Sequence, residues 1–251
     1  MQEHRRRPAR HVRTDRPMPM PAVVFILGLV LASGCSELST GDLDAVKDRG
    51  VLRIAVPPGF VETPPAAIDQ GDVRTDLRHL AARLGVEISW VEAERHDLLL
   101  ALLGEGRADM VVSRLSPASL IGRDAVATAP VEWVDELLVT GTAMPELRPD
   151  DLRGGVVTLQ TLTPSPAVTK ALDELGLEIE TAFEDVAVED LLSHVVRGTV
   201  ASTVVDSGIL AKFPEAARLQ VIGPLVERRP VAWVVREGNL QLRRAIDDFL
   251  V

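Results

Sequence analysis

Residues 98–116 read LLLALLGEGRADMVVSRLS. Its closely spaced leucines predict a helix that ends at the Gly-Glu-Gly turn, and Ala-Asp-Met-Val-Val-Ser predicts a short apolar strand. A helix that leads straight into an apolar strand is typical of the crossover connections of parallel sheets. Because the same order recurs on both sides of the stretch, the sequence predicts an α/β protein.

The helix and strand patterns fall into two similar halves. The first half is expected to hold helix 43–50, strand 51–56, helix 72–84, strand 86–91, helix 96–106 and strand 108–113. The second half is expected to hold strand 156–161, helix 165–176, strand 177–183, helix 188–198, strand 200–206, strand 230–235 and helix 239–250. Connections near residues 134–144 and 221–230 join the halves, and two such crossings predict a hinge. Small ligands usually bind in the cleft between two lobes of this kind.

The N-terminal residues predict export and lipidation. The chain has 251 residues, is 46% hydrophobic and carries a formal net charge of −10, so it can bury a core and offers no basic surface to nucleic acid. Its basic start runs into the apolar stretch 21–35, PAVVFILGLVLASGC, which is typical of a signal peptide. The segment ending at Cys35 resembles a bacterial lipobox. We expect a signal peptide over residues 1–34, lipidation of Cys35 and a tether over residues 35–42; the alternative for Cys35 is an incidental buried thiol.

Several segments resemble, in the same order, those of bacterial extracellular solute-binding proteins of family 3. They are LDAVKDRGVLRIAV (43–56), LLLALLGEGRADMVVSRLS (98–116), DLRGGVVTLQ (151–160), GTVASTVVDSGIL (198–210) and VAWVVREGNLQLRRAIDDFL (231–250). The resemblance implies a type II periplasmic-binding-protein-like fold: α/β, with two lobes, each a mainly parallel sheet flanked by helices, and a two-segment hinge. It implies lobe 1 at residues 43–138 and 226–251 and lobe 2 at 139–225. The N-terminal binding domain of membrane-bound lytic murein transglycosylase F is also similar in three places: the DxRG sequence and strand at 151–160, the LL-x-x-V-x-x-G helix at 191–198 and the V-x-W-x-V-R strand at 231–236.

The same resemblance implies a charged ligand site. The family has an Asp at the end of the strand that matches 200–206, where it pairs with the ligand's amine; this is Asp206, which could also cap the helix that follows. The family's carboxylate-binding arginine matches Arg123 only after a two-residue shift in alignment. Arg114, next to Ser113 at the end of strand 108–113, is the rival, and either arginine could be a solvated surface residue. We expect Arg123→Ala to weaken ligand binding more than Arg114→Ala, and Arg107 to lie on the outer side of its turn.

Two further positions belong to the expected site. Thr163 precedes helix 165–176, whose first N–H groups could bind an anion, although a plain helix start is the alternative. Phe60 is expected to form an aromatic wall for the ligand, with Trp133 as the next choice. Trp90 and Trp233, inside apolar strands, are expected in the core.

The sequence holds no arrangement typical of catalysis or metal binding. His79, His96 and His194 fall on separate expected helices, and no HExxH or paired-cysteine pattern occurs. We therefore expect no catalytic residue, metal or cofactor. The preferred hypothesis is a monomeric, lipid-anchored periplasmic protein that captures a small polar, amino acid-like ligand for an ABC transporter or sensor, with an ABC permease as partner. The alternatives are a non-catalytic binding or regulatory module of peptidoglycan metabolism, and an enzyme of the dehydratase kind that resembles binding proteins.

Overall fold

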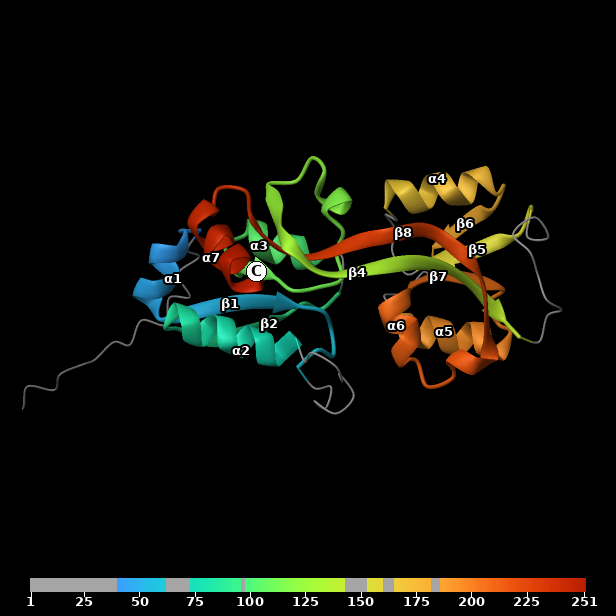
Figure 1. Cartoon of the computed structure of the whole chain (residues 1–251), viewed down its shortest axis with the longest axis horizontal. Helices are drawn as coiled ribbons and strands as arrows, with labels where there is room; N and C mark the ends of the chain where they lie inside the picture. The colour runs from blue at the N-terminus through green and yellow to red at the C-terminus, as the bar shows by residue number, and fades with distance from the viewer. Residues whose placement is uncertain (1–39, 62–72, 96–97, 143–152, 160–164, 182–185) are drawn as a thin grey trace, which may run out of the picture. The chain divides into compact units, whose positions relative to one another are not determined.

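The computed structural model describes residues 40–61, 73–95, 98–142, 153–159, 165–181 and 186–251 (Figure 1). All of them belong to one compact unit, Glu37–Val251. The expected signal peptide, Cys35 and Thr163 lie outside the described residues, so what the sequence predicts for them stays a prediction. Within the described ranges, no helix has the length and apolar character needed to cross a membrane.

Eight strands of the described residues form one sheet, in the order β2-β1-β3-β8-β4-β7-β5-β6. They are β1 (Val51–Val56), β2 (Glu87–Glu92), β3 (Met110–Val111), β4 (Ala125–Gly141), β5 (Val156–Leu159), β6 (Glu178–Thr181), β7 (Ser202–Asp206) and β8 (Leu219–Arg236). β1 pairs in parallel with β2 and β3, and β5 pairs in parallel with β6 and β7. β4 and β8 run antiparallel to each other between these two groups. The predicted α/β fold with two parallel halves is confirmed.

The helices follow the predicted alternation with the strands. They are α1 (Leu43–Arg49), α2 (Val73–Leu84), α3 (Leu99–Gly104), α4 (Pro166–Glu174), α5 (Val188–Arg197), α6 (Ser207–Lys212) and α7 (Leu240–Leu250). Figure 1 shows α1, α2, α3 and α7 with the β1–β3 group, and α4, α5 and α6 with the β5–β7 group. Each group of parallel strands is therefore connected and covered by its own helices, as crossover connections require.

The central strands β4 and β8 are longer than the sequence predicted, since only residues 230–235 were expected to be a strand. The two strands pair from the Ala125↔Arg236 end to the Gly141↔Leu219 end. The expected crossings between the halves fall on these strands, so the two-segment hinge is a pair of hydrogen-bonded strands. The predicted lobe boundaries lie inside β4 and β8 and stay predictions.

Prolines interrupt the ladder between β4 and β8. Pro130, Pro224 and Pro230 have no N–H to donate, and register shifts occur at several points along the pair, including both sides of Pro130. A shift of this kind bends a strand and increases its twist. The prolines also weaken the local sequence pattern from which these two strands could have been predicted.

Each strand group has its own buried core. On the first group, Leu52, Ile54 and Met110 are fully buried together with residues of α2 and α7. Trp233 is only 2% exposed, and half-buried Trp90 packs against the same cluster. The expectation that Trp233 belongs to the core is confirmed. On the second group, α4 and α5 cover β5, β7 and β4 with a separate set of Leu and Val side chains.

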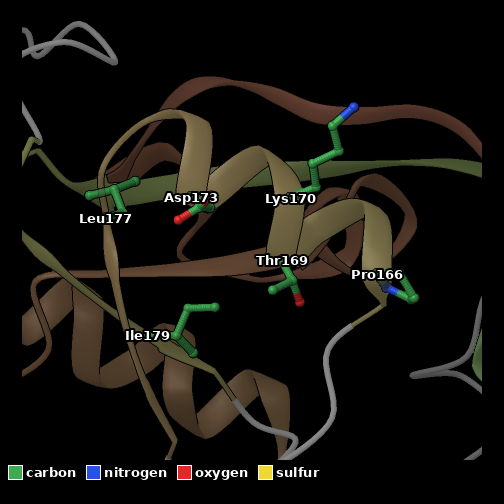
Figure 2. A pocket seen from close by; sticks show the side chains of 6 residues that line it. All are labelled: Pro166, Thr169, Lys170, Asp173, Leu177 and Ile179. Atoms are coloured by element: carbon green, nitrogen blue, oxygen red, sulfur yellow. The ribbon is translucent and has the colours of Figure 1, made fainter.

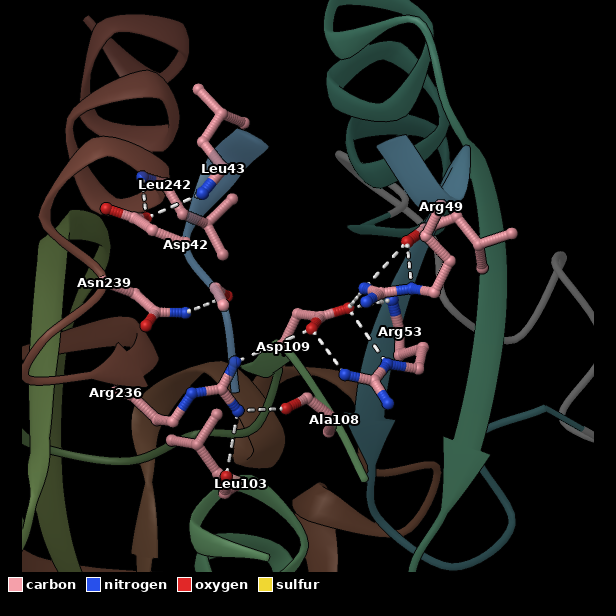
Figure 3. A network of polar contacts seen from close by, with 12 residues as sticks. Asp42, Leu43, Arg49, Arg53, Leu103, Ala108, Asp109, Arg236, Asn239 and Leu242 are labelled. Carbon is pink, nitrogen blue, oxygen red and sulfur yellow. Dashed lines mark hydrogen bonds and ion pairs between the residues drawn. The ribbon is translucent and has the colours of Figure 1, made fainter. Parts of the chain in front are cut away.

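A buried aspartate links the start of the fold to its end (Figure 3). Asp109 follows the Gly-x-x turn before β3, and its side chain is fully buried. It accepts a hydrogen bond of 2.6 Å from Arg49 Nη2, of 2.8 Å from Arg53 Nη2 and of 2.8 Å from the Arg53 backbone N–H. Arg236 Nη2 lies 3.6 Å away. One carboxylate thus faces three guanidinium groups that belong to α1, β1 and β8.

Arg236 also satisfies the backbone of the turn before β3. Its Nη1 donates to the carbonyl oxygens of Leu103, at 3.0 Å, and Ala108, at 2.6 Å (Figure 3). Burial lowers the pKa of the Arg236 guanidinium, and the charge of Asp109 opposes that shift. These contacts fix the end of β8 against the turn that places β3 and the residues after it.

Asp42 caps two helices at once. Its side chain accepts hydrogen bonds of 2.8 Å from the N–H groups of Leu43 in α1 and of Gln241 and Leu242 in α7. Asn239, the N-cap residue of α7, makes no capping bond with its own side chain and instead donates to the Gly41 carbonyl at 3.2 Å. The segment that enters the fold is therefore fastened to the last helix.

Candidate functional site

The ends of β3 and β7 bring together an arginine and an aspartate. Arg114 lies just after β3, and Asp206 is the last residue of β7. Arg114 Nε lies 2.5 Å from Asp206 Oδ2, and Arg114 Nη2 lies 2.9 Å from Asp206 Oδ1. Two parallel bonds of this kind are the strongest geometry for a guanidinium and a carboxylate. The pair connects the two strand groups directly.

Three more charged residues complete this arrangement. Glu132 Oε2 lies 2.9 Å from Arg114 Nη1. Arg229 forms an ion pair with Glu136, and its Nη2 lies 3.7 Å from Asp206 Oδ2. Arg229 Nη1 also donates to the Arg114 carbonyl oxygen at 3.2 Å. We call Arg114, Glu132, Glu136, Asp206 and Arg229 the hinge cluster; with all groups ionised, it carries one more negative than positive charge.

The pairing of the strands explains why these side chains meet. Glu136 on β4 lies opposite Asp206 on β7, and Arg229 on β8 lies opposite Val134 on β4. Residues directly opposite on neighbouring strands have side chains on the same face, within contact distance. The middle of β4 therefore carries carboxylates next to the carboxyl end of β7, while β8 supplies the second arginine.

Because Gly208 has no side chain, it leaves room for the charged side chains of the hinge cluster. A Cβ at this position would lie 2.7 Å from Arg114 Nη2, 2.8 Å from Glu132 Oε1 and 3.3 Å from Asp206 Oδ1. The first two distances are shorter than a carbon atom allows without a shift of its neighbours. The glycine at the start of α6 thus permits three charged groups to converge at one point.

Burial and charge affect two pKa values in the hinge cluster. Burial acts to lower the pKa of the Arg114 guanidinium, but its hydrogen bonds and ion pairs with Asp206 and Glu132 outweigh burial and raise that pKa. Burial raises the pKa of Glu136, and nearby Asp206 adds to the shift while Arg229 opposes it. Arg114 is therefore a permanent cation, whereas Glu136 takes up a proton more readily than an exposed glutamate.

Comparison with known proteins gives one relative in sequence. No family model matches the chain. The chain is 25% identical over 175 residues to the membrane-bound lytic murein transglycosylase F of Desulfosudis oleivorans. The match covers 67% of this chain and 38% of the transglycosylase, so the chain spans less than two fifths of that relative's length.

Comparison with solved structures identifies proteins of the same fold. The substrate-binding protein of an amino acid ABC transporter matches with a TM-score of 0.64 at 17% identity, over 80% of this chain and 91% of that one. Tv2483, crystallised with L-arginine bound, matches with a TM-score of 0.70 at 16% identity, over 82% of this chain and 86% of that one. The chain has the two-lobed fold of amino acid-binding proteins. The resemblance predicted from the sequence is confirmed at this level.

Asp206 serves as helix cap and ion-pair partner together. Besides its pair with Arg114, its Oδ1 accepts a hydrogen bond of 2.9 Å from the N–H of Ile209 in α6. The capping alternative is therefore confirmed. Its expected contact with a ligand amine stays a prediction; Asp206 is the last residue of β7.

Of the two rival arginines, Arg114 is the one that reaches Asp206. Arg123 is exposed in the turn after the short 3₁₀ helix Pro117–Leu120, where its N–H donates to the Leu120 carbonyl at 3.0 Å. Ser113 is half-buried directly before Arg114. Arg107 pairs at 3.5 Å with Glu105, and both are largely exposed, as expected for the outer side of the turn. The expected order of Arg123 and Arg114 in ligand binding stays a prediction.

Phe60 packs against its own strand group. Its ring centre lies 5.6 Å from that of Trp90, and the Arg74 guanidinium lies 5.6 Å above the Phe60 ring. Trp133, the second expected aromatic, is 54% exposed on β4, and the Arg228 guanidinium lies 5.5 Å from its ring centre. Neither ring lies among the described contacts of the hinge cluster, and their contribution to a ligand site stays a prediction.

Sequence reasoning missed Glu132, Glu136, Gly208 and Arg229. The stretches 130–136, PVEWVDE, and 227–230, ERRP, resemble solvated turns because they combine charges with proline. Their sequence positions, in or beside the two expected crossings between the halves, could have identified them, since the ligand sites of two-lobed proteins lie beside the hinge.

A groove of ≈ 640 Å³ lies elsewhere, along the outside of α4 (Figure 2). It is lined by Pro166, Thr169, Lys170, Asp173, Leu177 and Ile179. None of these residues belongs to the hinge cluster, and Figure 2 shows the Lys170 side chain extending away from the groove centre. In the part of the chain that the structure describes, no three His, Cys, Asp or Glu side chains gather as metal ligands.

Proposed function

We propose that the protein is a lipid-anchored, extracytoplasmic solute-binding protein that captures a small polar, amino acid-like ligand for an ABC transporter or sensor. The observation that carries this proposal is the opposition of Arg114 and Asp206 at the ends of two strand groups within an amino acid-binding fold. Ligands of open α/β sheets bind outside the carboxyl ends of the strands, which is where these side chains lie.

The pair offers the two charges that an amino acid requires. The Arg114 guanidinium matches the two oxygens of a carboxylate, and the Asp206 carboxylate accepts hydrogen bonds from an ammonium group. In the structure, the two side chains satisfy each other. A zwitterion whose carboxylate replaces Glu132 on the Nη1 side of Arg114, and whose ammonium group pairs with Asp206, exchanges one ion pair for two. Neither Arg114 nor Asp206 is then left buried and unpaired. The free energy of binding then depends on how much the two new ion pairs stabilise the complex beyond the one that is lost.

The remaining parts of the proposal concern location and partners. Lipidation at Cys35 would hold the protein at the membrane surface of the periplasm, with an ABC permease as the partner that receives the ligand. We further propose that the protein acts as a monomer and has no catalytic activity of its own. Support comes from the lipobox-like sequence and from the similarity to the substrate-binding protein of an amino acid ABC transporter.

Calorimetry on the purified chain tests the proposal. The protein is titrated with each of the protein amino acids, and Asp206→Asn is compared with Asp173→Asn, which removes the same charge from the groove on α4. Asn caps helices as well as Asp, so Asp206→Asn should remain folded. We expect Asp206→Asn to weaken binding at least about tenfold, since an ion pair to the ligand amine is lost. Binding that responds only to Asp173→Asn, or an absence of amino acid binding, would refute this site.

A second candidate function rests on the sequence relative. The similarity to lytic murein transglycosylase F over 175 residues favours a non-catalytic binding or regulatory module of peptidoglycan metabolism. In that case the Arg114–Asp206 pair would meet the charged groups of a peptidoglycan peptide. Titration with a purified disaccharide-tetrapeptide discriminates the two functions: this module binds the muropeptide more tightly than any free amino acid, whereas a transport protein shows the reverse order.

A further inference from the structure

We propose that Glu132 is a specificity residue, which makes the hinge cluster reject ligands with a second carboxylate and prefer neutral or cationic ones. The inference rests on the proposed function and names the class of ligand that the site accepts. It follows from the way in which Arg114 is shared between two carboxylates of different exposure.

The guanidinium of Arg114 is occupied on two sides. Asp206 takes Nε and Nη2, at 2.5 and 2.9 Å, while Glu132 takes Nη1 at 2.9 Å. The Asp206 side chain is only 4% exposed, that of Arg114 34% and that of Glu132 43%. A ligand that approaches from solvent therefore meets Glu132 before it meets Asp206.

A ligand carboxylate can reach Arg114 only by replacing one of these partners. To displace Asp206 would leave a buried carboxylate without its main cation, which is costly. Glu132 is half-exposed, and exposed ion pairs contribute little, so its departure costs less. The ligand carboxylate thus takes the Nη1 side, and Asp206 stays in place to receive the ligand amine.

The displaced Glu132 remains beside the ligand as a negative charge. The position of a Cβ on Gly208 lies within 3.3 Å of atoms from Arg114, Glu132 and Asp206, so all three side chains converge at one point. Arg229 does not neutralise Glu132, because it is paired with Glu136 and Asp206. The excess negative charge of the cluster then lies next to the ligand side chain. It repels a second carboxylate and attracts an ammonium or guanidinium group.

The test compares ligands that differ only in charge. L-glutamine and L-glutamate have nearly the same shape, and L-lysine adds a cation; their affinities are measured by calorimetry for wild type, Glu132→Gln and Glu227→Gln. Glu227 is exposed on β8 outside the cluster, so its variant matches the change in net charge. We expect the wild type to bind glutamine and lysine in preference to glutamate. Glu132→Gln should raise the affinity for glutamate, relative to that for glutamine, by about tenfold and weaken lysine binding, because one like charge is removed. Glu227→Gln should leave these ratios unchanged.

The outcomes separate the inference from the proposed function. If the wild type binds amino acids but Glu132→Gln changes the affinities for glutamate and glutamine by the same factor, the role given to Glu132 is wrong and the proposed function stands. If none of the three amino acids, and none of the others tested, binds to wild type or variants, the proposed function itself is wrong. The melting temperature of each variant serves as the folding control, and Glu132→Ala, which removes the whole carboxylate, should shift the ligand preference in the same direction.

Discussion

Replacement of Asp109 by Asn should destabilise the protein more than any other single charge change among the contacts described above. The substitution keeps the size of the side chain but removes the carboxylate that contacts Arg49, Arg53 and Arg236. Removing one partner of a buried ion pair costs about 3–5 kcal/mol, because the remaining charge stays buried. For a chain of this size, about 2–4 °C is lost per kcal/mol, so the melting temperature should fall by roughly 6–20 °C.

Thermal and urea unfolding of Asp109→Asn, beside wild type and Glu105→Gln, measures this effect. Glu105 pairs with Arg107 at 3.5 Å on the surface, so its variant should change the melting temperature by about 4 °C at most. Hydrogen exchange adds a local measurement, since the Arg53 amide that donates to Asp109 should exchange faster in the variant. A loss of stability no larger than that of Glu105→Gln would refute the view that this buried network holds α1, β1 and β8 together.

Two further predictions concern the central strands. Gly141→Ala should lower the free energy of unfolding more than Gly208→Ala does. A Cβ at 141 meets the Val195 backbone carbonyl oxygen at 2.8 Å, whereas a Cβ at 208 meets only the ends of flexible side chains. Urea unfolding of both variants measures the two losses, and equal losses would contradict the prediction. Burial raises the pKa of Glu136 above its ordinary 4.5, so the folded state holds that proton more tightly than the unfolded state does. The unfolding free energy of wild type should therefore fall, relative to that of Glu136→Gln, as the pH rises from about 4.5 through the raised pKa; parallel pH profiles of the two proteins would contradict the shift.

Local patterns were sufficient to predict the parallel half-sheets but not the strands between them. The helix-to-strand units before β3 and β7 are continuous in sequence, and their apolar spacing is visible without tertiary information. β4 and β8 gain their structure by pairing with each other across nearly a hundred residues of chain. Pro130, Pro224 and Pro230 weaken the local strand signal, and only the pairing partner compensates for them.

In the candidate site, too, some residues can be predicted from local sequence and others depend on how distant strands pair. Asp206 could be predicted because it ends an apolar strand, which is a local observation. The choice between Arg114 and Arg123 depended on the path of the connection after β3, where no periodic pattern fixes the register. The 3₁₀ helix Pro117–Leu120 and the turn after it leave Arg123 at the surface. Glu132 and Arg229 could not be assigned, since their meeting depends on which residues of β4 and β8 lie opposite each other.

The hinge cluster lies at an irregular part of the backbone pairing between β4 and β8. Register shifts occur on both sides of Glu136, between it and Val134 and between it and Leu137. At these points the ladder loses hydrogen bonds, and the ion pairs of Glu136 and Asp206 with arginines supply contacts across the same region. A change in those ion pairs therefore acts where the backbone pairing of the two strands is interrupted. Under the proposed function, binding of a zwitterion at Arg114 and Asp206 changes these ion pairs, and we propose that this connects ligand capture to the two central strands.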